Sequence, residues 1–232
     1  MGYLLTIEAP DASGKSTQIE LLCKRLAASG RSVRQVRFPN YGSDACKPVE
    51  AYLNGALGKD PHATNAYAAS VLFAVDRYFS YQIDWKKELE KPESIILLDR
   101  YTTSNAIHQL AKLTDMTERE AFLAWLYDLE FGKMGLPKPD DTLFLDVPPG
   151  VSLSLLKARA EKDESHVTDI HEADTAYLAH CYEAAKFAAS RLHWHTVTCA
   201  PGEKMRTADD IADEIFFYVS ARIAEKERKD RC

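Results

Sequence analysis

The sequence predicts an α/β fold with a mostly parallel sheet and helices on both of its faces. Short β-rich runs alternate with longer stretches of helical pattern along the 232 residues. Two of these runs, 94–99 (SIILLD) and 141–147 (DTLFLDV), are dominated by isoleucine, leucine, valine and phenylalanine. Such composition is typical of strands that are covered on both faces, as in a parallel sheet.

Each element follows from a local pattern and from the residues that end it. Strands are expected at 3–8, 32–38, 94–99, 141–147 and 195–200. Helices are expected at 15–29, 44–57, 62–90, 103–112, 117–129, 151–161, 169–192 and 208–226. Gly30 follows the first helix and Pro92 follows the third, and both residue types commonly end helices. The charged final residues, EKERKDRC, are expected to fray.

Composition limits the classes of protein to which the chain can belong. A length of 232 residues suffices for one sizeable core, and no repeat or linker divides it, so one domain is expected over 1–232. The net charge of −6 argues against a protein that coats nucleic acid or lies on a membrane surface. We therefore expect no nucleic-acid and no membrane partner.

Cysteine usage and the N-terminus indicate a cytoplasmic protein. The five cysteines are odd in number and form no CxxC pair, which favours reduced thiols over a disulfide framework or a zinc site. The N-terminus shows no signal-peptide pattern, and no apolar run approaches the length of a membrane span.

A phosphate-binding loop is predicted between the first strand and the first helix, in the stretch IEAPDASGKSTQ (7–18). This strand–loop–helix context is the one that the P-loop motif requires. Lys15 would reach the β- and γ-phosphates of a nucleotide, and Ser16 can bind Mg²⁺. The residues expected to bind the nucleotide donor here are Ser13, Gly14, Lys15, Ser16 and Thr17.

Two residues of this loop depart from the full motif. Ala9 stands where the motif has glycine, and Pro10 removes one backbone donor. The alternative interpretation is a chance GKS sequence at the start of an ordinary helix. The position of the motif after a predicted strand favours the phosphate loop.

An aspartate, Asp11, lies in the middle of the predicted loop. Its charge would oppose direct contact with a triphosphate, so a sugar hydroxyl or a metal-bound water suits it better. This suggests that two ligands meet at the loop, a phosphate donor and a second nucleotide. A structural alternative is an Asx turn that stabilises the loop.

A second set of charged residues begins where the predicted strand 94–99 ends. The carboxyl ends of parallel strands line the ligand crevice of an open sheet. Asp99 is therefore placed to face Mg²⁺ or to orient reacting phosphates, and Arg100 can clamp a phosphate with two hydrogen bonds. The alternative is an Asp–Arg ion pair that caps the strand end.

Aromatic residues accompany these charges. Phe73 and Arg77 lie four residues apart in SVLFAVDRY (70–78), so a ring and a donor share one helix face. Phe73 can then stack on a base, or it can belong to the core. Phe38 and Tyr41 lie in RFPNYGS (37–43), where a strand ends in a turn, and are expected at the same crevice edge.

Together these segments resemble the thymidylate kinase family of P-loop nucleoside-monophosphate kinases. The similarity extends from IEAPDASGKSTQ through FPNY, LFAVDR and DRYTTSNAIHQ to TLFLDVPP and DIHEADTAYLAHCY. It implies a three-layer P-loop kinase fold with a five-stranded parallel sheet. It also implies transfer of the γ-phosphate of ATP to dTMP with Mg²⁺, by a protein that forms a homodimer.

The resemblance implies roles in recognising the base and sugar of dTMP. Phe73 would stack on thymine, Arg77 would bond its exocyclic oxygen, and Asn105 would read the base edge. Ser104 belongs to the same substrate-binding set. His108 would replace an aromatic residue that excludes a 2′-hydroxyl.

For the sugar and the phosphates, the resemblance implies a further set. Asp11 would bind the 3′-hydroxyl, and Phe38 would form a wall of the sugar pocket. Tyr41 and Arg100 would hold the acceptor phosphate. Asp99 would serve the metal and phosphoryl transfer.

The stretch KARAEKDESHVTDIHE differs from the family's usual lid. A short mobile lid is expected around 160–168, but after Arg159 it offers only Lys162 and His166 as basic residues. Arg159 resembles the family's helix-end arginine near the adenine, and Glu172 would help to close the acceptor site. Lys15, Arg100 and Mg²⁺ are left to offset the charge of the transferred phosphoryl group, with Lys162 as a weak candidate.

Two other functions remain open on the sequence alone. One is a kinase for a different acceptor, such as dUMP or a deoxynucleoside. A deoxynucleoside hydroxyl would need a base to remove its proton. Asp99 is the only obvious candidate, since the other nearby carboxylate, Glu8, borders the phosphate loop. The other is a nucleotide binder that has lost catalysis, which the missing lid arginines would explain.

Overall fold

The computed structural model describes residues 1–10, 13–160 and 175–230. Five strands form one parallel sheet in the order β2-β3-β1-β4-β5. They are β1 (Tyr3–Glu8), β2 (Ser32–Arg37), β3 (Ser94–Asp99), β4 (Asp141–Asp146) and β5 (His195–Thr198). The predicted parallel α/β sheet is therefore confirmed. The carboxyl ends of the central strands β1 and β3 lie together, because Ile7 pairs with Asp99.

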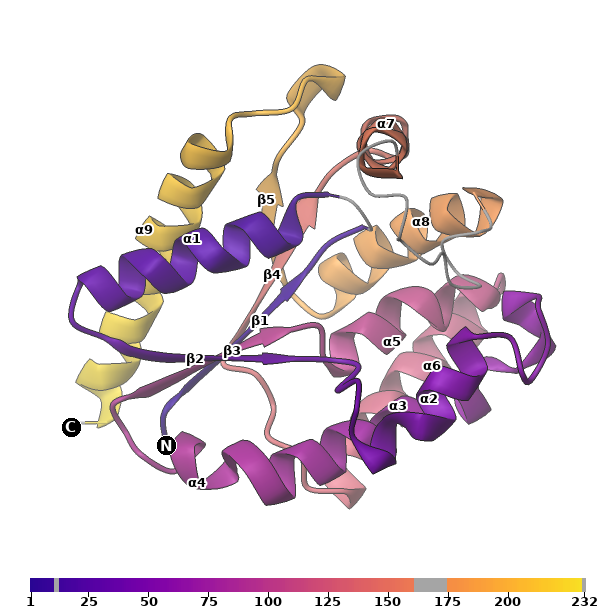
Figure 1. Cartoon of the computed structure of the whole chain (residues 1–232), viewed down its shortest axis with the longest axis horizontal. Helices are drawn as coiled ribbons and strands as arrows, with labels where there is room; N and C mark the ends of the chain where they lie inside the picture. Colours follow the sequence, from indigo (N-terminus) through magenta and orange to yellow (C-terminus); the bar gives the residue numbers. More distant parts are fainter. Residues whose placement is uncertain (11–12, 161–174, 231–232) are drawn as a thin grey trace.

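Helices cover both faces of this sheet (Figure 1). The helices are α1 (Lys15–Ala28), α2 (Lys47–Leu53), α3 (Ala66–Ser80), α4 (Lys86–Leu89), α5 (Thr102–His108), α6 (Met116–Tyr127), α7 (Pro149–Ala160), α8 (Thr175–Arg191) and α9 (Ala208–Asp230). Alternate residues of β1 face opposite layers. Leu5 and Ile7 pack with α1 and α9, whereas Leu4 packs with Trp85 and Leu89 on the other face.

The predicted helix over 62–90 is wrong as a single element. A short 3₁₀ turn, Pro61–Ala63, comes first, and the side chain of Asn65 then caps α3 by accepting a hydrogen bond from the backbone N–H of Ala68 at 2.8 Å. After Ser80 the chain widens into a π-helical segment, Tyr81–Trp85, before α4. Asparagine is a strong helix-capping residue, so the start of α3 has a physical cause.

For residues 225–230 the predicted fraying of the C-terminal end is also wrong, because α9 continues to Asp230. Lys226 Nζ donates to the backbone oxygen of Gly2 at 2.8 Å and to both carboxylate oxygens of Asp140 at 2.7 Å. Arg31 of the α1–β2 connection pairs with Glu227. These contacts fasten the charged end of the helix to the amino ends of the strands.

Asp141 joins the same end of the sheet to α9, and its removal is expected to destabilise the fold. Its carboxylate accepts from Tyr3 Oη at 2.6 Å, Tyr218 Oη at 2.9 Å and Arg222 Nε at 3.0 Å. For Asp141→Ala we expect a loss of about 2–3 kcal/mol in the free energy of unfolding, because three donors lose a charged acceptor. Urea denaturation measures this loss.

The matched control is Asp209→Ala. Asp209 is an exposed residue whose closest oxygen lies 3.6 Å from Arg25 Nη2. An exposed pair of this kind contributes about 0–1 kcal/mol. Equal urea midpoints for the two variants would show that the Asp141 contacts do not stabilise the fold.

Candidate active site

The turn from β1 into α1 has the features of an anion site. Gly14 caps the helix with φ of 82°, a left-handed conformation that glycine adopts without strain. The first turn of α1, which the structure describes in full, contains no acidic side chain, so its N–H groups and dipole favour an anion. Ser13 Oγ is buried and has no hydrogen-bond partner among the described residues. Ser16 and Thr17 are exposed at this turn.

Ala9, which replaces the motif's first glycine, is accommodated by the core. It is 1% exposed and belongs to the apolar cluster that includes Ile7, Ile19 and Val147. Its methyl group therefore points away from solvent, and the substitution does not disrupt the strand-to-loop connection.

Lys15 and Asp99 form a buried ion pair at the mouth of this turn. The pair is a consequence of topology, since α1 follows β1 and Asp99 ends the neighbouring strand β3. Arg37 Nε lies 3.5 Å from the second carboxylate oxygen of Asp99. An ammonium group and a carboxylate are thus held side by side where phosphates would enter.

Arg100 follows directly and has a constrained backbone. Its φ of 69° is unusual for a residue with a side chain. Arg100 Nη1 lies 3.0 Å from His108 Nε2. Arginine can only donate, so this nitrogen of His108 accepts, and the ring proton lies on Nδ1, 3.6 Å from Cys181 Sγ.

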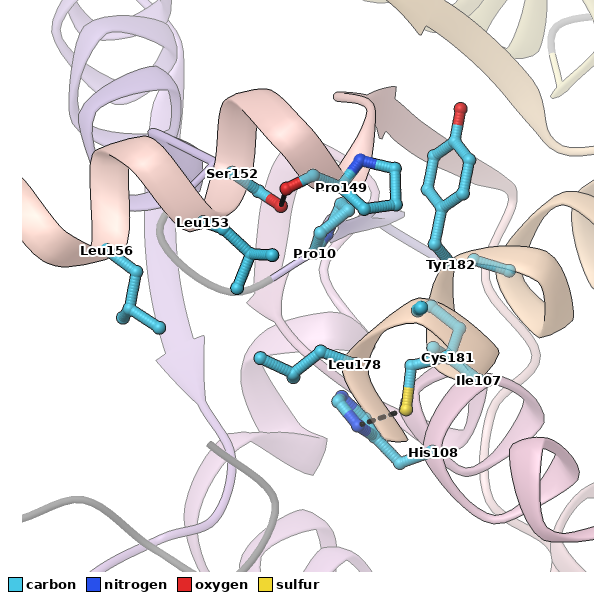
Figure 2. A pocket seen from close by; sticks show the side chains of 12 residues that line it. Pro10, Ile107, His108, Pro149, Ser152, Leu153, Leu156, Leu178, Cys181 and Tyr182 are labelled. Carbon is cyan, nitrogen blue, oxygen red and sulfur yellow. Dashed lines mark hydrogen bonds between the residues drawn. The ribbon is translucent and has the colours of Figure 1, made fainter. Parts of the chain in front are cut away.

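His108 lies on a hollow beside the phosphate loop, between α5, α7 and α8 (Figure 2). Pro10, Leu153, Leu178 and Cys181 are among its lining residues. Its lining is mainly apolar, which suits the carbon skeleton of a ligand and not its phosphates.

Glu8, at the end of β1, organises the start of α5. It is fully buried and accepts from Thr103 Oγ1 at 2.6 Å and from Ser104 Oγ at 2.8 and 2.9 Å. Ser104, predicted to bind substrate, is therefore engaged with Glu8. The sequence signal was available, because a glutamate that ends an apolar strand directly before a phosphate loop needs buried donors.

The residues predicted to recognise a base lie on α3 and α5. Arg77 is 1% exposed, and its Nε and Nη2 donate to the two oxygens of Glu130 at 2.7 and 2.6 Å. Asn105 Nδ2 donates to the backbone oxygen of Ser70 at 3.3 Å. Phe73 is partly buried on the same helix as Arg77. Sequence reasoning missed Glu130, which is 53 residues from Arg77 and carries no motif.

Phe38 and Tyr41 occupy different surroundings. Phe38 is 3% exposed and packs in the core, with its ring centroid 5.9 Å from that of Tyr101. Tyr41 is 58% exposed. Asp76 accepts from the backbone N–H of Asn40 at 2.9 Å and so ties this turn to α3. Burial raises the pKa of Asp76.

Ser16 and Asp99 fit the Mg²⁺ ion that the sequence predicts. Within the described ranges, no three histidine, cysteine, aspartate or glutamate side chains gather into a metal cage. Mg²⁺ commonly binds one or two protein oxygens together with substrate phosphates and water. A serine hydroxyl and a carboxylate beside a phosphate loop satisfy that requirement.

Several predicted site residues lie outside the described residues. They are Asp11, Glu172, Lys162, His166 and the expected lid from residue 161 onward. The side chain of Arg159, near the end of α7, is likewise not described.

Comparison with known proteins identifies related chains. A family model described as thymidylate kinase matches residues 7–204. Thymidylate kinase of Mycobacterium tuberculosis is 34% identical over 172 residues, covering 74% of this chain and 78% of the relative. The human thymidylate kinase is 31% identical over 147 residues, covering 63% of this chain and 61% of the relative.

A solved structure of thymidylate kinase from Candida albicans has the same fold. It superposes with a TM-score of 0.65 at 22% identity, covering 95% of this chain and 92% of that one. Among the helices that the structure describes, none has the length and apolarity needed to cross a bilayer.

Proposed function

This chain belongs to the thymidylate kinase family, and we propose that it phosphorylates dTMP to dTDP in the crevice at the carboxyl ends of β1 and β3. ATP is the phosphate donor of this nucleoside-monophosphate kinase. The observation that supports this location best is the buried Lys15–Asp99 pair beside the open N-terminus of α1. This ion pair joins Lys15 of the phosphate loop to Asp99, the residue that precedes Arg100.

On the donor side, the residues 13–17 bind the phosphates of ATP. The backbone N–H groups at the start of α1 and the Ser13 hydroxyl, which is buried without a partner among the described residues, supply donors. When the nucleotide binds, the ammonium group of Lys15 leaves Asp99 and pairs with the phosphates. Mg²⁺, held by Ser16 and Asp99, would neutralise part of the phosphate charge. Arg159, by the family resemblance, would lie near the adenine.

On the acceptor side, Arg100 and Tyr41 hold the phosphate of dTMP. An oxygen of this phosphate attacks the γ-phosphorus of ATP in line, and the bond to the ADP oxygen breaks. A phosphate monoester is already largely ionised at neutral pH, with a second pKa of about 6, so no side chain has to act as a base. Positioning and charge neutralisation then supply most of the rate acceleration.

The thymidine part of the acceptor lies between α3 and α5. Phe73 stacks on the base, and Arg77 donates to its exocyclic oxygen. Asn105, whose amide nitrogen already donates to Ser70, offers its oxygen to the base N3–H. Ser104 donates a hydrogen bond to Glu8 and so helps to hold α5, the helix that carries Asn105.

The sugar lies near the loop and the hollow that His108 lines. Asp11 accepts from the 3′-hydroxyl, and Phe38 backs the sugar pocket through its contact with Tyr101. His108 occupies the space that a 2′-hydroxyl would need. Glu172 and a lid around 160–168 would close over the acceptor and keep water from the γ-phosphate.

An ADP-release assay tests the proposed function directly. Purified protein is supplied with ATP and Mg²⁺, and with dTMP, dUMP, dCMP or thymidine as the acceptor. We expect the highest kcat/KM with dTMP and no turnover when Mg²⁺ is chelated. ATP binding without phosphoryl transfer to any nucleoside monophosphate would instead indicate a degenerate nucleotide binder.

The protein also forms a homodimer in this proposal, through the outer side of α3. Val71, Val75 and Phe79 recur at every fourth residue and are 42%, 36% and 50% exposed. This apolar stripe lies on the side of α3 opposite Phe73 and Arg77, as helical spacing dictates. An exposed stripe of this kind suits a self-complementary interface with a second copy.

We expect Phe79→Glu to weaken the dimer by at least about 30-fold, the effect of losing one strong interface residue. Light scattering coupled to gel filtration measures the molar mass as the protein is diluted. Phe217→Glu is the matched control, because Phe217 is 79% exposed on α9, away from α3. A monomeric wild-type protein, or a Phe79→Glu variant that remains fully dimeric, would disprove this interface.

We place the protein in the cytoplasm as one domain over 1–232 without nucleic-acid or membrane partners. The cysteines within the described ranges, Cys23, Cys46, Cys181 and Cys199, carry thiols. Burial raises the pKa of Cys46 and of Cys199 to about 12, which suits unreactive thiols in a reducing compartment.

A further inference from the structure

A buried ion pair between Arg77 and Glu130 lies next to the acceptor crevice. The two side chains are 2% and 0% exposed. Arg77 uses Nε and Nη2 to donate to both carboxylate oxygens, at 2.7 and 2.6 Å. This two-point geometry fixes the plane of the guanidinium group as well as its position.

Glu130 is itself held by a second element. It belongs to the π-helical segment Asp128–Lys133 that follows α6, and it accepts from Thr102 Oγ1 at 2.7 Å. Thr102 is the first residue of α5, only two residues after Arg100. The carboxylate therefore links α3 to the start of α5, the helix that follows Arg100 and carries the predicted base-reading residue Asn105.

Stability alone does not explain such a pair. Burying two charges costs desolvation energy, and apolar residues of similar volume often stabilise a core equally well. What the pair provides is orientation. With Nε and Nη2 engaged by Glu130, Nη1 donates a long hydrogen bond of 3.4 Å to the backbone oxygen of Tyr101, and the two Nη groups keep further N–H donors.

We propose that Glu130 is a positioning residue for base selection, which holds Arg77 so that the remaining Nη donors of Arg77 meet the 4-carbonyl oxygen of a thymine or uracil base. This inference rests on the proposed function, because it takes Arg77 as the residue that contacts the exocyclic oxygen. Glu130 acts only through Arg77 and touches no substrate.

The fixed guanidinium gives the site its discrimination against cytosine. Arginine has five N–H donors and no acceptor, whereas cytosine presents an amino group at position 4. A mobile arginine could turn aside and leave that amino group to water. An arginine held by Glu130 cannot turn aside. Its N–H donors then face the amino group of cytosine, which also donates, and the mismatched base is rejected.

The test is Glu130→Gln, which preserves size but replaces one acceptor oxygen with a donor. Initial rates and calorimetric binding are measured for dTMP and dCMP. We expect the dTMP KM and Kd to rise about tenfold, the effect of one misplaced hydrogen bond to a charged group, while the values for dCMP change little. The preference for dTMP then falls about tenfold. The KM for ATP and the kcat at saturating dTMP stay near those of the wild type.

Two further variants keep the inference falsifiable if Glu130→Gln folds poorly. Thr102→Val removes one hydrogen bond to Glu130 and should shift the preference in the same direction by a smaller factor. In the double variant Arg77→Met with Glu130→Met, two apolar side chains fill the space, and the preference for dTMP over dCMP should disappear. Asp141→Ala, far from this crevice, controls for loss of stability and should leave both KM values unchanged.

The outcomes separate the inference from the proposed function. A wild-type protein that does not phosphorylate dTMP would overturn the proposed function and the inference with it. A wild-type protein that does, together with folded variants that keep the wild-type dTMP KM and preference, would overturn the inference alone. The Arg77–Glu130 pair would then be a structural element of the core.

Discussion

Replacement of Lys15 by methionine is expected to lower turnover with ATP and dTMP by at least about 10²–10³-fold, the usual cost of removing one preorganised charge or donor from a reacting phosphoryl or acyl group. Lys15 is 8% exposed and already lies at the nucleotide loop, where it pairs with Asp99. The position therefore needs little reorganisation when phosphates arrive. Methionine keeps an unbranched side chain, one atom shorter, and removes its charge.

Folding has to be separated from catalysis in this variant. Breaking a buried ion pair leaves an uncompensated carboxylate, which can cost about 3–5 kcal/mol, although Arg37 also approaches Asp99 at 3.5 Å. Thermal denaturation and calorimetric binding of dTMP report whether the crevice is intact. Lys24→Met is the matched control, since Lys24 is exposed on the same helix. Turnover of Lys15→Met within tenfold of the wild type would contradict the role of Lys15.

The sheet could be predicted from the sequence because its strands are encoded locally. The bounds of β1 and β3 agree with the predicted ranges 3–8 and 94–99. Both strands are buried at every position, and the run of isoleucine and leucine in β3 is typical of a strand covered on both faces. The edge strand β5 is shorter than predicted, ending at Thr198.

Helix boundaries were harder to predict, because tertiary contacts decide them. The π-helical segment Tyr81–Trp85 interrupts the range 62–90, which the sequence predicts as one helix, and the segment Asp128–Lys133 extends past the predicted helix end at residue 129. The C-terminal end of α9 is ordered by Gly2 and Asp140, partners 224 and 86 residues away from Lys226 in sequence. A run of charges reads as a solvated end unless those partners are known.

In the candidate site, too, the sequence predicts the residues that lie in motifs but not the distant residues that contact them. Lys15, Asp99 and Arg100 lie where strands end, so motif and topology together predict their neighbourhood. The partners that orient the predicted residues could not be inferred in this way. Glu130 reaches Arg77 only because the segment after α6 packs under α3 and α5.

Arg100 provides the second large effect, and its backbone allows an unusually clean test. Its φ of 69° places a non-glycine residue in the left-handed region, which costs about 1–2 kcal/mol relative to the ordinary helical conformation. Arg100→Gly relieves this strain, whereas Arg100→Ala keeps it. We therefore expect the glycine variant to be more stable than the alanine variant by about 1 kcal/mol. Chemical denaturation of both proteins measures the difference.

Both Arg100 variants are nevertheless expected to lose about 10²–10³-fold in kcat/KM for dTMP, because both lack the guanidinium that clamps the acceptor phosphate. Because the guanidinium contacts the acceptor and not the donor, we expect the KM for dTMP to rise while the KM for ATP changes little. Both variants also lose the hydrogen bond to His108. Arg100→Lys should recover only part of the activity, since an ammonium group cannot bind a phosphate in the two-point geometry of arginine. A difference in stability between the two variants, together with equal losses of activity, would assign the loss of activity to the guanidinium group itself. Near-normal turnover and dTMP affinity in Arg100→Ala would instead show that the acceptor phosphate binds elsewhere.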